Sequence, residues 1–95
     1  MMDQDGPVGL RDEALAALRV MLGQPSVSNE DGEYWYVARR APGRGGFDVH
    51  LNHPADPAVA EVLVMAGAYR VYTVQARTIE DLRLGLRVVE MIVRP

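Results

Sequence analysis

The feature that most constrains this fold is the amount of apolar surface on two segments, residues 56–66 and 78–93. On a helical wheel at 100° per residue, apolar residues cover most of the circumference of 78–93, interrupted by Asp81 and Gly85. The remaining arc of about 80° holds Glu80, Arg83, Arg87, Glu90 and Arg94. Between positions 58 and 68, Glu61 is the one charged residue. A helix that packs on one sheet needs an apolar stripe of only about 100°. As helices, both segments therefore carry more apolar surface than one sheet covers.

The chain has 95 residues, which is enough for one domain and few secondary-structure elements. In one interpretation, one of the two helices is central in the monomer, between the sheet and the first helix. In the other, part of the apolar surface closes against another subunit or a partner protein. The small number of elements favours the second, because large uncovered apolar patches usually mark interfaces, and two-fold dimers are the commonest assembly. We therefore predict a homodimer or a protein-binding module.

The hydrophobic periods predict a single small α+β domain in residues 10–95, after a flexible tail of residues 1–9. Apolar residues recur at helical spacing in 10–22, and residues 47–51 alternate between apolar and polar types. Asp56 followed by Pro57 is typical of a helix start, and Gly67 can end that helix. The predicted order is α-β-β-α-β-α, with helices at 10–22, 56–66 and 78–93, strands at 33–39, 47–51 and 69–76, and a further short strand at 26–28.

From this order we expect a mainly antiparallel sheet of three or four strands, with the helices packed chiefly on one face. The leading functional prediction is a non-catalytic protein–protein interaction module: a homodimer, complex subunit, inhibitor or adaptor. Its contact surface is the apolar surface of the helices. The predicted interface residues are Val59, Leu63, Leu84, Val88, Met91 and Ile92.

A second prediction starts from the arginine-rich, glycine-rich segment 39–46. Arg39, Arg40 and Arg44 could grip phosphates at the tip of a hairpin, and Trp35 with its tyrosine neighbours could stack on bases. The net charge of −3 disfavours non-specific binding along nucleic acid, although residues 36–95 carry a local excess of arginine. Nucleic-acid binding is therefore the alternative function.

A third prediction is a small enzyme or metal protein around His50 and His53, which lie near Asp48 and Asp56. Two histidines with optional carboxylates are a weak zinc signal, and no nucleophile motif accompanies them. We expect no catalytic residue and no cofactor. The chain has no cysteine and no apolar run long enough to span a bilayer, so we expect a cytoplasmic protein without disulfides or membrane contact.

Overall fold

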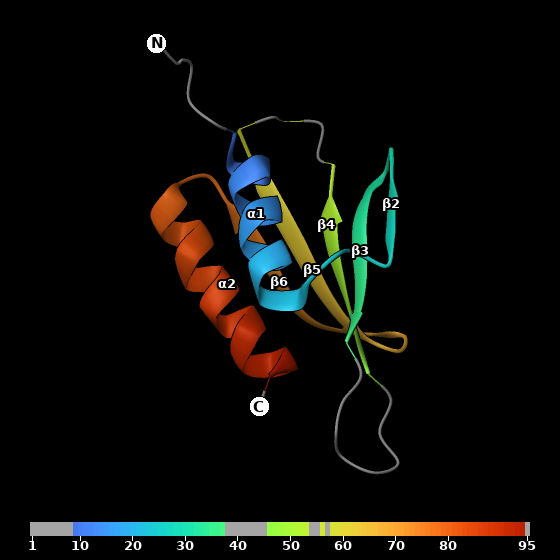
Figure 1. Cartoon of the computed structure of the whole chain (residues 1–95). Coiled ribbons are helices and arrows are strands. Elements are labelled where there is room, and N and C mark those ends of the chain that lie inside the picture. The colour runs from blue at the N-terminus through green and yellow to red at the C-terminus, as the bar shows by residue number, and fades with distance from the viewer. Residues whose placement is uncertain (1–8, 38–45, 54–55, 57, 95) are drawn as a thin grey trace.

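A computed structural model describes residues 9–37, 46–53, 56 and 58–94 (Figure 1). Residues 1–8 of the predicted tail at 1–9, and the arginines at 39, 40 and 44, lie outside the described residues. Along the chain, one helix precedes five strands and a second helix follows them, in the order α-β-β-β-β-β-α. The elements are α1 (Leu10–Leu22), β2 (Val27–Asn29), β3 (Gly32–Val37), β4 (Phe47–Asn52), β5 (Ala60–Ala66), β6 (Tyr69–Ala76) and α2 (Ile79–Val93).

The helix predicted for residues 56–66 is wrong, because most of this segment is strand β5. Its side chains follow a period of two: Ala60, Val62 and Val64 are buried, and the residues between them are half-buried. Asp56 does not cap a helix; its Oδ1 accepts a hydrogen bond from the Ala58 amide at 2.9 Å, as in an Asx turn. A continuous apolar run fits a strand with one face in the core as well as it fits a helix, and here the sheet takes it.

The five strands form one antiparallel sheet in the order β2-β3-β4-β5-β6, so each strand pairs with its neighbours in sequence. The predicted α+β class and the antiparallel sheet are confirmed, and the strand number is five rather than three or four. Gly67, at φ 60°, lies in the short connection between Ala66 and Tyr69, which joins two strands instead of ending a helix. The predicted short strand at 26–28 corresponds to β2.

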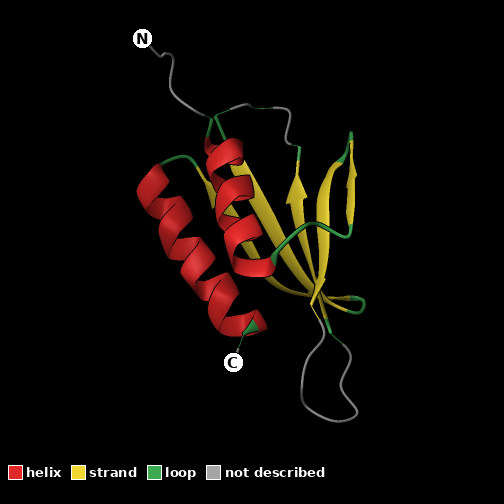
Figure 2. Cartoon of the chain, viewed as in Figure 1, coloured by secondary structure: helices red, strands yellow, loops and turns green. Residues whose placement is uncertain are grey.

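Both helices cover the same face of the sheet, as predicted (Figure 2). α1 packs over β4 and β5, whereas α2 packs over β6 and beside α1. The core between these layers contains buried side chains from both helices and from β3 to β6. Trp35 anchors it at 1% exposure, and its indole N–H donates to the Gly23 carbonyl at 3.0 Å. The other face of the sheet carries no helix among the described residues.

Candidate functional site

The position of α2 decides which of its side chains reach solvent. Thr78 caps the helix, because its Oγ1 accepts a hydrogen bond from the Asp81 amide at 3.1 Å. The buried face carries Gly85 directly above Val74 of β6, where even a methyl group would lie 2.6 Å from a Val74 γ carbon. At the other end, Arg94 donates to the Met21 carbonyl of α1 at 3.2 Å. The helix is thus fixed against β6 on one side and α1 on another.

The remaining side of α2 carries an apolar stripe, which we define as Leu84, Val88 and Met91. At 100° per residue these three positions span about 60°, adjacent to the Gly85 side and far from the α1 side. Leu84 is 61% exposed and Met91 is 73% exposed, while Val88 is partly covered. Figure 1 shows α2 at the β6 side of the molecule, with α1 on its inner side. The stripe therefore faces outward at the β6 edge of the sheet.

Strand β6 forms that edge and has β5 as its one neighbour in the described sheet. It is eight residues long, from Tyr69 to Ala76, with one charged residue and no proline. The opposite edge is β2, which has only three residues. Natural proteins protect edges by shortening them or by placing charges and proline there. β2 is protected by its shortness. β6 is long and carries a single charge and no proline, so it has little protection.

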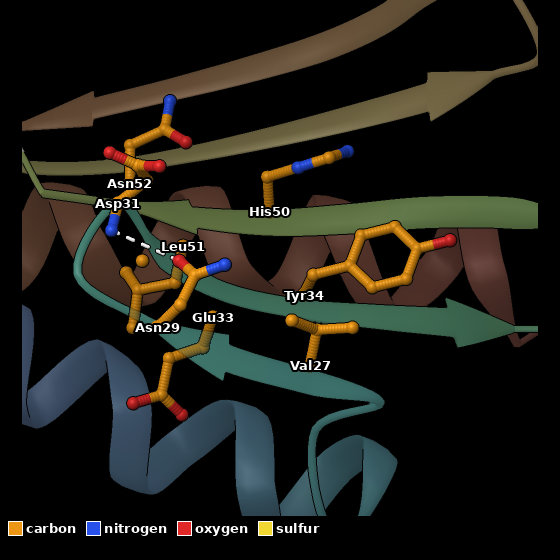
Figure 3. A pocket seen from close by; sticks show the side chains of 9 residues that line it. Val27, Asn29, Asp31, Glu33, Tyr34, His50, Leu51 and Asn52 are labelled. Atoms are coloured by element: carbon orange, nitrogen blue, oxygen red, sulfur yellow. Dashed lines mark hydrogen bonds between the residues drawn. The ribbon is translucent and has the colours of Figure 1, made fainter.

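The open face of the sheet carries a second group of side chains. The register places Tyr34, His50, Leu63 and Thr73 in one row across four strands. The Tyr34 and His50 rings lie edge to face at 5.1 Å between centroids. Both rings line a shallow hollow of about 260 Å³, into which they project from neighbouring strands (Figure 3).

A polar network crosses the same face next to this hollow. The Glu61 carboxylate accepts hydrogen bonds from Asn52 Nδ2 at 2.9 Å and from Gln75 Nε2 at 2.7 Å. These two bonds favour the ionised form and hold the pKa of Glu61 below its ordinary value. A second hollow of about 170 Å³ lies over this network. Thr73 is among the residues that line it, and the Oγ1 of Thr73 is a buried oxygen without a hydrogen-bond partner among the described residues.

Asp48 binds and orients the Tyr34 side chain at one end of the open face. Its Oδ1 accepts the Tyr34 hydroxyl hydrogen at 2.6 Å. This bond to the neutral phenol, aided by the negative charge of Asp48, raises the pKa of Tyr34 above 10.0. The bond fixes the ring orientation, so Tyr34 is a positioned side chain rather than a free one. The open face thus combines aromatic rings with two carboxylates, Asp48 and Glu61.

The structure separates the six predicted interface residues into four places. Leu84, Val88 and Met91 come together in the stripe of α2, whereas Ile92 is half-buried and packs against the core. Leu63 projects from β5 on the open face of the sheet, and Val59 precedes that strand. These two residues do not lie on a helix, so the predicted helical surface exists on α2 and not at 56–66.

The residues predicted to bind phosphates or metal are only partly brought together. Trp35 is enclosed in the core and offers no face for stacking. His50 lies on the open face of β4, and His53 is exposed beyond the end of that strand. Within the described ranges, no group of three or more His, Cys, Asp or Glu side chains is arranged to hold a metal ion. Neither described helix is long and apolar enough to cross a membrane.

Sequence reasoning missed the edge position of β6. Residues 69–76 carry a strand pattern, but whether a strand lies at an edge depends on the strand order. The only available signal was the run of β-branched and aromatic residues with a single charge. No protein-family model, curated protein or solved structure matches the chain. The geometry of the described residues is therefore the basis for a functional proposal.

Proposed function

We propose that the protein is a non-catalytic protein-interaction module of the cytoplasm. Its contact surface is the α2 stripe of Leu84, Val88 and Met91 together with the neighbouring strand β6, which we call the contact edge. The observation that carries the proposal is the exposure of Leu84 and Met91 on one side of a helix whose opposite side is already buried. An apolar surface of this kind next to an unprotected strand edge is typical of a protein interface.

The magnitudes explain why both parts of the contact edge are needed. Full burial of a large apolar side chain contributes about 1.5–3 kcal/mol, so covering the exposed parts of Leu84 and Met91 supplies about 2–4 kcal/mol. Association costs about 4–15 kcal/mol in lost translational and rotational freedom. The stripe alone therefore gives only weak binding. Main-chain hydrogen bonds along β6 supply the additional contact that a stable complex requires.

The proposal is tested by site-specific photo-cross-linking in cells that express the protein. A photoreactive side chain replaces Leu84 in one variant and Val20 in a matched control. Val20 is 90% exposed on α1, but it lies outside the contact edge. We expect protein cross-links from position 84 and few from position 20. Equal yields at the two positions, or no protein product at position 84, would reject the contact edge.

Nucleic-acid binding is the second candidate, and one observation favours it. Tyr36 is 55% exposed at the end of β3, next to the arginine-rich segment, and its register partner on the open face is Asp48. A stacking platform for bases would use Tyr36 together with Tyr34. The carboxylates of Asp48 and Glu61 repel phosphates on that face, which makes this candidate weaker than the protein interface.

A further inference from the structure

The contact edge has two parts on the same side of the molecule: the outer backbone of β6, unpaired within the described sheet, and the exposed apolar stripe of α2. The outer backbone groups of β6 have no neighbouring strand within the described sheet, and the stripe of α2 lies on the same side. The connection from Ala76 to Ile79 contains only two residues, so α2 runs back over β6 in the opposite direction. One operation that covers the strand edge can therefore cover the helix stripe as well.

We infer that the partner at the contact edge is a second copy of this chain, joined by a two-fold axis perpendicular to the sheet. This inference rests on the proposed function and names its partner. The axis pairs β6 with the partner's β6 in antiparallel fashion and continues the sheet from one protomer into the other. Because the rotation keeps the helices on the same face, it also places α2 against the partner's α2. The same symmetry operation therefore satisfies both parts of the surface.

The side chains of β6 tolerate such pairing. If Val74 lies opposite its own copy, Tyr72 faces Ala76 of the partner subunit, and Thr73 faces Gln75 of the partner subunit. No like charges meet in this register. Thr73 and Gln75 are both polar and uncharged, so this cross-strand pair brings no charge into the contact.

The helices fit the same axis. In an antiparallel α2 pair centred between residues 87 and 88, Leu84 lies opposite Met91 of the partner subunit and Val88 lies near its own copy. Gly85 marks the point where α2 passes over Val74. The centre of the helix pair lies about 4 Å from Gly85 along the helix axis. This distance corresponds to roughly one residue along the underlying strand β6. The axis of the helix pair and the axis of the strand pair therefore coincide to within about one strand residue.

The interface combines a helix contact with a strand contact in this arrangement. Specific complexes bury about 800 Å² on each partner. A helix stripe of three side chains falls short of that area, and the five paired residues of each β6, Tyr72 to Ala76, add to it. A foreign strand added to β6 would leave the stripe uncovered unless it also carried an apolar helix. The second copy supplies both elements by symmetry.

The decisive experiment is analytical ultracentrifugation of the purified full chain over the micromolar range. We expect the mass to rise to that of a dimer with increasing concentration. The variant Leu84→Glu/Met91→Glu and, separately, Thr73→Lys should weaken dimerisation by about tenfold or more, whereas Val20→Glu should leave it unchanged. Thermal unfolding of each variant confirms that the monomer is folded.

Because the chain has no cysteine, single-cysteine variants give an independent test of the geometry. Val88→Cys should form a disulfide-linked dimer under mild oxidation, and Val20→Cys should not. A strictly monomeric wild type, or equal cross-linking of the two variants, would overturn the two-fold pairing. If the wild type is monomeric while the photoreactive group at position 84 captures a different protein, only the self-pairing is wrong. If position 84 captures nothing either, both proposals fail.

Discussion

Gly85→Ala tests the packing of α2 on β6, on which the direction of the stripe depends. In an exposed helix interior, replacing glycine with alanine stabilises the fold by about 1 kcal/mol. At Gly85 the added methyl would lie 2.6 Å and 2.8 Å from the two γ carbons of Val74. The β carbon of Val74 is itself 3.2 Å away, so rotating the valine does not remove the contact.

The gain in helix propensity and the cost of overpacking together decide whether Gly85→Ala raises or lowers the free energy of unfolding. Overpacking a filled core costs about 1–3 kcal/mol, which exceeds the gain in helix propensity. We expect Gly85→Ala to lower the free energy of unfolding by about 1–2 kcal/mol. For a domain of this size, each kcal/mol corresponds to a change in Tm of about 4–8 °C.

Val74→Ala provides the matched background for this test. Removing the two γ methyls leaves the contact with the β carbon at 3.2 Å but removes the two shorter ones, so Gly85→Ala should cost much less there. Urea unfolding followed by circular dichroism on the four proteins of this cycle measures the coupling. If Gly85→Ala stabilises the wild type, α2 does not approach β6 as closely as described, and the outward direction of the stripe loses its support.

Three further predictions follow from contacts elsewhere in the structure. Thr78→Ala removes the cap hydrogen bond to the Asp81 amide and should lower the free energy of unfolding by about 1 kcal/mol in urea titrations; an unchanged midpoint would contradict the cap. The lowered pKa of Glu61 means that its ionised form stabilises the folded state above pH 4.5, and this stability is lost as the pH falls through the lower folded pKa. Glu61→Gln should therefore flatten the acid dependence of stability below pH 4.5, and equal slopes for both proteins would argue against the network. In gel-shift assays at low salt we expect no retention of single-stranded nucleic acid; salt-dependent retention that is lost in Arg39→Ala/Arg40→Ala/Arg44→Ala would instead support the nucleic-acid candidate.

The terminal helices could be predicted from the sequence because several local signals agree there. Residues 10–22 combine helical spacing with Gly23 at the end, and residues 79–93 combine helical spacing with the Thr78 cap. Residues 56–66 were mispredicted because an Asp-Pro pair and an apolar run suit a helix as well as a buried strand. The pairing of β5 with both β4 and β6 decides the outcome. That pairing depends on the neighbouring strands, whose positions the pattern of residues 56–66 alone does not contain.

The candidate site was predictable in part for the same reason. The excess apolar surface of the last helix was visible in its sequence, and it led to Leu84, Val88 and Met91. The assignment of Leu63 to the same surface failed with the helix at 56–66, because the strand turns this residue to the open face of the sheet. The free edge of β6 appears only once the strand order is known.

Hydrogen exchange of the β6 backbone amides tests the two-fold pairing most directly. Within the described sheet, the β6 amides that point away from β5 have no neighbouring strand, so they report on the strand edge itself. The pairing predicts that these amides exchange more slowly as the protein concentration is raised, and that Leu84→Glu/Met91→Glu removes this protection. Exchange at the outer amides of β6 that does not depend on concentration would contradict it.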